Sequence, residues 1–531
     1  MNTPNLSEKD LNKMPKEVLV SMIIGLQSSI NELNRTVSIL SEQIRVMNQR
    51  SYGRKSEQVS ALQLELELGL NEAEAAADPK EPEPSLKEAA PRKKRPAGKR
   101  AEDIKKITNH RTEKIEISKE ELDRQFGKGN WKKLPPQIIT KLEHIPASFE
   151  AVTYEIGVYA EKNGDRIIRA DKPSELWQNS IATPSLVASI IFGKYVNAVP
   201  LYRQEKVYAE NNINISRTTM ANWMIAASEK YLKYYYEALK KELLKHKYLH
   251  ADETSVEVSK DGRKTGALSY MWVYTTEDDT AKPRRIVLYD YQKTRSHEHP
   301  KYFLRGFSGT LTTDGYQAYH KLEKEDPETF TVAGCWVHAK RKYAEIVKAN
   351  SSLSNKGTFA ETAVKMISKI FHKNGKLDKL KPEERLAKRE KDIKPLVDDY
   401  FKWVKSNVRY VDKASQTGKA FAYSLNQEEY LRTFLEDPNI GMDNNTAERA
   451  IRPFTTGRKN WVMIDTIKGA EASAVLYSLA ETAKANDLKT YDYFRYLLTE
   501  LPKYIHDFET DIPVSLFPWS EDFPKDVFKD K

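Results

Sequence analysis

Residues 247–258, KYLHADETSVEV, begin the part of the chain that predicts its fold class. This stretch, ALSYMWVYTTED (267–278) and RRIVLYDYQ (284–292) are rich in Val, Tyr, Leu and Thr, which is typical of strands. GTLTTDGYQAY (309–319) reads as a fourth strand running into a turn, and TFTVAGCWVHAKRKYAEIV (329–347) as a fifth strand followed by a basic helix. Three strands in meander order, then strands alternating with helices, predict a mixed α/β sheet.

The chain has 531 residues, far more than one typical domain, and its patterns change several times along its length. We therefore predict a multidomain α+β protein. The expected segments are a coiled coil at 16–50, a basic linker at 51–107, a small mixed domain at 108–182, a helix-turn-helix domain at 183–246, the α/β domain in two parts at 247–344 and 438–500, a charged helical insertion between them at 345–437, and a C-terminal tail at 501–531.

Residues 16–50 carry the clearest periodic signal. Apolar residues recur every seven positions in two rows, Leu19, Leu26, Leu33, Leu40 and Met47 in one and Ile23, Ile30, Val37 and Ile44 in the other. Two such rows form the seam of a coiled coil, and β-branched residues in one row with leucine in the other favour a parallel pair of chains. The alternative is a single amphipathic helix packed on its own domain, but the narrow stripe favours the coiled coil.

Basic residues outnumber acidic ones, with Lys+Arg 86, Asp+Glu 76 and a formal net charge of +10. Such an excess is typical of proteins that bind polyanions, of which nucleic acid is the usual one. The stretch PRKKRPAGKR (91–100) places six basic residues within ten, in a segment whose Ala, Glu and Pro content predicts disorder. This run either contacts DNA phosphates or is a solvated tail.

Cys335 is the single cysteine, which excludes a disulfide within the chain and a zinc site with paired cysteines. This suits a reducing cytoplasm. The first residues have no basic segment followed by an apolar core, so we expect no signal peptide. There is no apolar run of about 18 residues, so we expect no transmembrane helix either.

Residues 183–246 read as helical. PLYRQEKVYAENN (200–212) predicts one helix, and SRTTMANWMIAASEKY (216–231) predicts another after a tight turn, with Ser216 as its N-cap. The second helix should turn Met220, Trp223 and Met224 to one face, and Arg217, Thr218 and Asn222 to the other. A polar second helix after a tight turn fits a helix-turn-helix DNA reader, with an ordinary helical hairpin as the alternative.

Three carboxylates are the candidate catalytic and metal-binding residues. Asp252 lies toward the end of the first strand, Asp314 at the end of the fourth, and Glu448 on a helix that Pro453 should end or kink. Carboxylates from neighbouring strands and a helix can meet at one sheet edge, where their oxygens suit Mg²⁺. Taken singly, however, an Asp before Gly is more often a turn residue, and a helical Glu is usually solvated.

Residues near the three carboxylates have more than one reading. Glu253 should point to the opposite face of the strand from Asp252, whereas His250 shares the face of Asp252. Asp443 is expected to cap the helix of Glu448. His338 begins a basic helix. The basic residues near the site and one tryptophan form a candidate DNA-binding set, with a solvated face as the alternative: Lys340, Arg341, Arg449, Arg452, Arg458, Lys459 and Trp461, the last of which could stack on a displaced base.

The C-terminal half resembles transposases of the insertion-sequence-66 family. The matching stretches are HADET, LTTDGYQAY, CWVHAKRKY, DNNTAERAIRPFTTGRKNW (443–461) and GAEASAVLYSLAETAKAN (469–486). Upstream, PLYRQEK with SRTTMANW resembles the family's helix-turn-helix, and YGRKSE (52–57) resembles the segment after its N-terminal coil. The resemblance implies a ribonuclease-H-like catalytic domain with a helical insertion and a triad at Asp252, Asp314 and Glu448.

The resemblance also implies a cofactor and an activity. Two Mg²⁺ ions, or Mn²⁺ in their place, would serve strand cleavage and strand transfer of DNA. Expected partners are the element's terminal repeats, target DNA, a second copy of the chain through the coiled coil, and accessory proteins of the same element. We expect a bacterial cytoplasmic, nucleoid-associated protein. The rivals are a catalytically inactive or domesticated DNA-binding relative and a metal-dependent nuclease of the same fold; an Asp/Glu hydrolase unrelated to DNA does not fit the basic clusters.

One stretch departs from the family pattern. Family members usually carry a small zinc-binding domain with paired cysteines before the helix-turn-helix. The corresponding residues 152–168, VTYEIGVYAEKNGDRII, contain no cysteine. We therefore expect a zinc-finger-like domain that binds no zinc and whose apolar residues replace the metal.

Overall fold

The computed structural model describes most of the chain apart from its N-terminal linker region. The described residues are 14–52, 180–264, 266–277, 284–349, 357–505 and 512–529, with a few more between 120 and 177. The chain divides into two compact units, residues 1–56 with 173–529, and residues 57–172 with the last two residues.

In the second unit, β1 (Val158–Ala160) and β2 (Ile167–Arg169) form an antiparallel pair. The linker predicted at 51–107, apart from its first two residues, and most of the small domain predicted at 108–182 lie outside the described residues. The expectations of disorder, and of a zinc-finger-like domain without zinc, therefore stay predictions.

The segment predicted as a coiled coil is one helix, α2 (Lys16–Tyr52). Seven residues of its two apolar rows leave half or more of their side-chain surface exposed: Ile23, Leu26, Ile30, Leu33, Val37, Leu40 and Ile44. A helix that exposes an apolar stripe of this length has a face suited to a partner.

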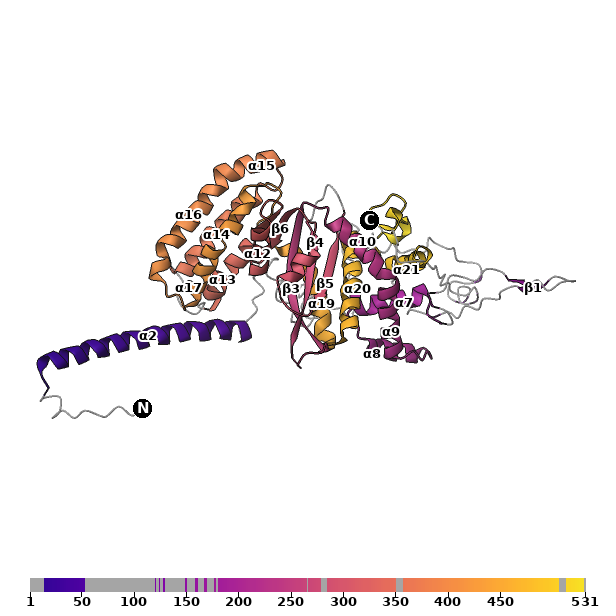
Figure 1. The fold of residues 1–531 in the computed structure, drawn as a ribbon, viewed down its shortest axis with the longest axis horizontal. Helices are drawn as coiled ribbons and strands as arrows, with labels where there is room; N and C mark the ends of the chain where they lie inside the picture. Colours follow the sequence, from indigo (N-terminus) through magenta and orange to yellow (C-terminus); the bar gives the residue numbers. More distant parts are fainter. Residues whose placement is uncertain are drawn as a thin grey trace. The chain divides into compact units, whose positions relative to one another are not determined.

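A mixed sheet forms the centre of the first unit, as predicted (Figure 1). Its strands are β3 (Tyr248–Lys260), β4 (Leu268–Thr276), β5 (Val287–Gln292), β6 (Gly309–Thr313) and β7 (Phe330–Gly334), in the order β5-β4-β3-β6-β7. The first three strands are antiparallel, and β6 and β7 add to β3 in parallel. A short strand that the sequence did not predict, β8 (Ile464–Thr466), pairs with the far end of β3.

Helices connect and cover these strands. They are α11 (Glu298–Phe303), α12 (Gln317–Glu325) and α13 (Trp336–Ala349) between the strands and before the insertion, and α19 (Asn445–Trp461), α20 (Ile467–Ala485) and α21 (Thr490–Glu500) after it. Pro453, predicted to end or kink the helix of Glu448, does not end it, since α19 continues to Trp461. Proline removes one helical hydrogen bond, but Ile451, Phe454 and Gly457 are buried on this helix and stabilise it by packing.

Side chains bond several of the outward-facing backbone groups of both outer strands of the sheet. On β5, Tyr289 N–H donates to Ser478 Oγ at 2.7 Å, and Thr482 Oγ1 bonds both the N–H and the carbonyl of Val287 at 3.0 Å. On β7, the N–H of Val332 donates to Glu323 Oε1 at 2.8 Å, and Thr433 Oγ1 donates to the carbonyl of Val332 at 3.1 Å. These bonds satisfy polar groups that burial would otherwise leave unpaired.

The region predicted as a helix-turn-helix consists of α7 (Pro184–Ile191), α8 (Leu201–Glu210), α9 (Arg217–Ala227) and α10 (Lys233–Leu243), with π-helical turns at Phe192–Val196 and Ser228–Leu232. The N-cap prediction is confirmed, since Ser216 Oγ accepts the N–H of Thr219 at 3.2 Å. The face prediction is also confirmed: Met220 and Met224 are buried and Trp223 is partly buried, whereas Arg217, Thr218 and Asn222 are exposed.

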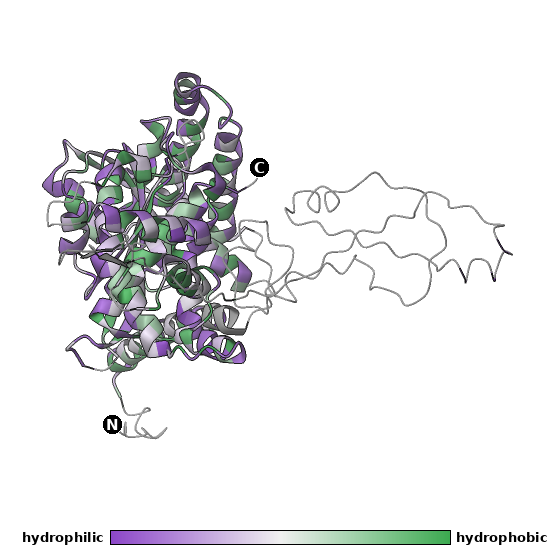
Figure 2. Ribbon diagram, turned by 90° about the vertical axis from the view of Figure 1, so that its right-hand side faces the viewer, coloured by the Kyte–Doolittle hydropathy of each residue, from purple (hydrophilic) through white to green (hydrophobic). Residues whose placement is uncertain are grey.

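These helices share one hydrophobic core with the sheet and α19–α21. The C-terminal residues 512–529, which form two short 3₁₀ turns at Val514–Leu516 and Lys525–Val527, contribute Leu516, Phe517, Phe523 and Val527 to the same core. In Figure 2, hydrophilic and hydrophobic residues alternate along the same helices, as expected for helices with one buried face.

The insertion builds a second core together with α13. Its elements are α14 (Phe359–Gly375), α15 (Pro382–Lys388), a π-helical turn at Arg389–Ile393, α16 (Lys394–Asn407), α17 (Gln416–Asn426) and α18 (Glu428–Arg432), with 3₁₀ turns at Val408–Tyr410 and Thr433–Leu435. Across the described part of the chain, no helix has the length and apolar character needed to cross a bilayer.

Candidate active site

The parallel pair of β3 and β6 sets the positions of two of the candidate carboxylates. Their register pairs His250 with Thr312, and Asp252 and Asp314 each follow two residues further along. Residues at equivalent positions on neighbouring strands face the same side, about 4.8 Å apart. Asp252 lies in the first half of β3 rather than toward its end, because the strand continues along β4 to Lys260.

Asp252 lies among other acidic groups. Burial raises its pKa well above the usual range, repulsion from Asp314 and Glu253 adds to this, and Glu448 contributes further. The N–H of Glu253 donates to Asp252 Oδ1 at 2.8 Å and offsets only part of the shift. Both other residues of the predicted triad therefore contribute to the electrostatic environment of Asp252.

The turn after β6 holds Asp314 and is supported by the insertion. Gly315 has a φ of +93°, and a Cβ there would approach the Gln427 side chain to 2.7 Å, so glycine is required. Asp314 Oδ1 accepts the N–H of Tyr316 at 3.1 Å, and its backbone carbonyl accepts the hydroxyl of Tyr423 in α17 at 2.8 Å. The insertion thus helps to fix one of the carboxylates.

Glu448 lies in the first turn of α19, which Asn444 fastens to the sheet. The fully buried Asn444 side chain donates to the Ala251 carbonyl at 2.8 Å and bonds His250 Nδ1 at 3.0 Å. Its backbone N–H donates to Cys335 Sγ at 3.3 Å. Asn444 occupies the N-cap position itself, while Asp443 Oδ1 accepts the N–H of Asn445 at 3.0 Å.

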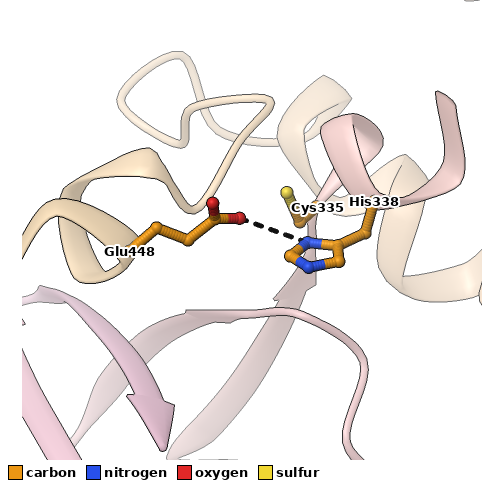
Figure 3. Close-up of side chains that lie close together, drawn as sticks. All are labelled: Cys335, His338 and Glu448. Carbon is orange, nitrogen blue, oxygen red and sulfur yellow. Dashed lines mark ion pairs between the residues drawn. The ribbon is translucent and has the colours of Figure 1, made fainter. Parts of the chain in front are cut away.

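The carboxylate of Glu448 faces α13 (Figure 3). Arg341 Nη2 donates to its two oxygens at 3.2 and 3.3 Å, and His338 Nδ1 lies 3.6 Å from Oε1. Burial, then the neighbouring Arg341, lowers the pKa of His338. Arg341, predicted as a phosphate ligand, is thus paired with Glu448 in this state.

Glu253 occupies a different environment from Asp252. Arg295 Nε donates to Glu253 Oε1 at 2.9 Å, and Arg295 Nη2 forms a second bond to the same oxygen. The guanidinium of Arg295 also lies 3.9 Å from the ring centroid of Tyr316. Burial, and then Asp314, raise the pKa of Glu253 to about 7, against the opposing effect of Arg295.

The basic residues predicted to bind DNA are placed differently from one another. Arg458 donates to Thr254 Oγ1 at 3.3 Å and to the Ser255 carbonyl, which ties α19 to β3. Lys340 lies 5.9 Å from the ring centroid of Phe371 in the insertion. Arg449 and Lys459 are exposed, Arg452 and Trp461 are partly buried, and Lys194 Nζ lies 5.2 Å from the ring centroid of Trp461.

Asn444, Arg295 and Tyr423 support the site, and the sequence analysis missed all three. Their partners are far away in the chain, with Asn444 separated from Cys335 by 109 positions and Tyr423 from Asp314 by 109. Asn444 stands inside the DNNTAER stretch and could have been singled out as a candidate helix cap. Nothing in the sequence next to Arg295 or Tyr423 indicates that either residue belongs to the site.

The donor set at this site fits a divalent cation. Three carboxylates from β3, the turn after β6 and α19 offer oxygen ligands, which hard cations such as Mg²⁺ prefer. Burial and then repulsion from the neighbouring acids raise the pKa of Asp252, and a bound cation would relieve that repulsion. Among the described residues, the single cluster of metal-ligating side chains within 4.8 Å is a different one, Cys335, His338 and Glu448.

The family model described as Transposase IS66 family matches residues 179–472, more than half of the chain. The chain belongs to the IS66 family of transposases. A second model, Transposase C of IS166 homeodomain, matches residues 39–104. The family match covers α7 through the first turn of α20 and includes all three candidate carboxylates.

Relatives among curated proteins cover most of the chain. The uncharacterized protein y4qI of Sinorhizobium fredii is 26% identical over 526 residues, covering 97% of this chain and 94% of its own length. The uncharacterized protein y4hP of the same organism is 28% identical over 461 residues, covering 82% and 81%. These similarities show no reaction, because both relatives are uncharacterized.

Proposed function

We propose that this IS66-family protein cleaves and joins DNA at the ends of an insertion sequence, with Asp252, Asp314 and Glu448 as its catalytic residues. The observation that carries the proposal is the placement of Asp252, whose carboxyl lies among acidic groups that include both other members of the triad. Charges that repel one another at a folded site are usually retained for function.

The three carboxylates would hold two Mg²⁺ ions, or Mn²⁺, which clamp the attacking and leaving oxygens of an in-line displacement at phosphorus. The protein's own contribution is to hold the three carboxylates in position. Asn444 fixes the start of α19, and Tyr423 fixes the Asp314 turn, so the ligands are held before DNA arrives.

Arg341 has a second role in this proposal. Its guanidinium neutralises Glu448 in the structure, and its side chain is 31% exposed. When a cation binds Glu448, the ion pair between Glu448 and Arg341 breaks, and Arg341 can turn toward a DNA phosphate. The planar guanidinium of Arg341 can donate two parallel hydrogen bonds to such a phosphate. The contact with DNA phosphates would extend to Arg449, Arg452 and Lys459, and to the N–H groups of Arg458 that do not bond β3. Trp461 would stack on an unpaired base.

DNA recognition and pairing of the two ends would use other parts of the chain. The exposed Arg217, Thr218 and Asn222 of α9 would read the terminal repeats in the major groove. The apolar stripe of α2 would pair with that of a second copy in a coiled coil, which brings two DNA ends together.

The sheet supports the assignment of a ribonuclease-H-like domain. Its three antiparallel strands followed by two parallel ones, with acidic residues on the adjacent β3 and β6 and on a following helix, have the arrangement expected of that fold. The insertion between Asp314 and Glu448 packs into a second core that it shares with α13, as an added domain docked on the sheet would.

The test is a cleavage and strand-transfer assay on DNA carrying the element's ends, with Mg²⁺. Glu448→Gln should lower both activities at least about 1,000-fold, because the change removes one anionic ligand and keeps the side chain's size. Glu383→Gln, on the exposed surface of α15, is the matched control and should behave as wild type. Undiminished joining by the Glu448 variant would refute the proposal, and cut products without joined ones in wild type would favour a nuclease.

The pairing role of α2 has its own measurement. Leu26→Glu with Leu33→Glu should lower the mass in solution measured by light scattering, since both side chains are exposed on the stripe. The exposed Glu32→Gln on the same helix is the control. A mass unchanged by the leucine substitutions would refute this part of the proposal.

A further inference from the structure

Cys335, His338 and Glu448 bring a sulfur, a ring nitrogen and a carboxylate oxygen within 4.8 Å of one another (Figure 3). Cys335 directly precedes α13, and His338 lies in its first turn, while Glu448 lies in the first turn of α19. We propose that this cluster binds a transition-metal ion of the Zn²⁺ type. The positive ends of two helices meet here and favour the anionic forms of the thiol and the carboxyl.

The geometry is close to that of a bound ion. Ligands around tetrahedral Zn²⁺ are separated by roughly 3.3–3.6 Å, given bond lengths of about 2.0–2.3 Å. His338 Nδ1 and Glu448 Oε1 are already 3.6 Å apart. His338 Nδ1 is buried and has no hydrogen-bond partner, so a cation would give it one.

Burial raises the pKa of the free Cys335 thiol to about 12, so a bound ion would have to displace the thiol proton, and two backbone N–H groups would then stabilise the thiolate. Cys335 is fully buried, and the backbone N–H groups of Asn444 and His338 both point to its sulfur, the former at 3.3 Å. Such donors stabilise a metal-bound thiolate from the layer outside the ligands. Sulfur and imidazole select zinc-like ions over Mg²⁺, which takes oxygen ligands.

Arg341 and the ion would compete for the same two groups. Arg341 bonds both Glu448 oxygens and donates from Nη1 to His338 Nε2 at 3.3 Å. A cation at the cluster therefore requires Arg341 to leave, which its partly exposed side chain permits. Removing the arginine should strengthen binding of the ion, whereas removing a structural residue would not.

The inhibitory consequence, unlike the site itself, rests on the proposed function. A zinc-type ion would draw Glu448 away from Asp252 and Asp314. Excess Zn²⁺ should then inhibit DNA cleavage in Mg²⁺, and Cys335→Ser should relieve that inhibition.

The single cysteine makes the binding test specific, because Cys335 alone can give a thiolate-to-metal charge-transfer band with Co²⁺. The full chain titrated with Co²⁺ should show this band at one ion per chain. Cys335→Ser should abolish it, and His338→Asn should weaken Co²⁺ binding more than about 10-fold. Arg341→Met should tighten it, and His372→Asn, exposed on α14, should leave it unchanged.

Absence of the band in wild type would overturn the proposal, as would equal Co²⁺ affinity in wild type and the His338 variant. Circular dichroism checks that each variant is folded, and the tighter binding expected of Arg341→Met does not depend on the cysteine variant. Co²⁺ binding without inhibition of cleavage by Zn²⁺ would leave the metal site standing and count against the role of Glu448 in the reaction.

Discussion

Asp252 and Glu253 are neighbours on β3, but they have different partners. Glu253 is paired with Arg295, which offsets part of its charge, although burial and Asp314 still raise its pKa. The carboxylate of Asp252 accepts one backbone N–H, from Glu253, and is otherwise repelled by the charges of Asp314, Glu253 and Glu448. An acid with a basic partner can be held within the fold, whereas one placed among other acids without such a partner is suited to a cation, as proposed for Asp252.

The largest expected difference between the two is in activity. Asp252→Asn should lower DNA cleavage at least about 1,000-fold, because it removes an anionic ligand of the proposed site. Glu253→Gln should lower it less than about 10-fold, because the lost ion pair lies beside the site. Rates measured under identical Mg²⁺ conditions decide this, and equal losses in the two variants would break the comparison.

The pH dependence of stability should distinguish Glu253. Its pKa rises from 4.5 to about 7 on folding, so the native state binds more protons in this interval and the free energy of unfolding falls as pH rises through it. The fall due to this group is up to about 3 kcal/mol, at about 1.4 kcal/mol per pKa unit. Urea unfolding in a chelator should show this fall in wild type relative to Glu253→Gln; parallel curves would contradict it.

Metal binding should stabilise the protein through Asp252. At a Mg²⁺ or Mn²⁺ concentration about 100 times the dissociation constant, the free energy of unfolding should rise by about 2.7 kcal/mol. Asp252→Asn should lose most of this gain and Glu253→Gln should keep it. Thermal unfolding with and without the metal measures both, and stabilisation retained by the Asp252 variant would place the ion elsewhere.

The smallest effect concerns stability without metal. Asp252→Asn should stabilise the metal-free protein by about 1 kcal/mol, because it removes a repelled, buried charge and keeps the oxygen that accepts the Glu253 N–H. Urea unfolding at neutral pH in chelator is the measurement. A destabilised variant would mean that the Asp252 charge is balanced by the fold after all.

Local patterns predicted the local structure. Val, Tyr and Thr content located β3, β4 and β5, and a serine before a polar helix located the N-cap of α9. The helix of Glu448 does not end at Pro453, one of the two predicted outcomes, because tertiary packing overrides a single lost helical bond.

What the sequence could not predict depends on distant contacts. Arg341 meets Glu448 across 107 positions, and the position of Cys335 near Glu448 follows from the same packing of α13 against α19. The single cysteine excludes a zinc site with paired cysteines within one chain. It gave no sign that a histidine and a glutamate would join it, because no spacing rule covers ligands so far apart.

The bonded edges of the sheet limit how copies of the chain can associate. Ser478 and Thr482 engage the backbone of β5, and Glu323 and Thr433 engage that of β7. A strand from another molecule would have to displace these side chains before it could extend the sheet. The sheet is thereby protected against edge-to-edge aggregation, and the proposed pairing of two copies uses the apolar stripe of α2 instead.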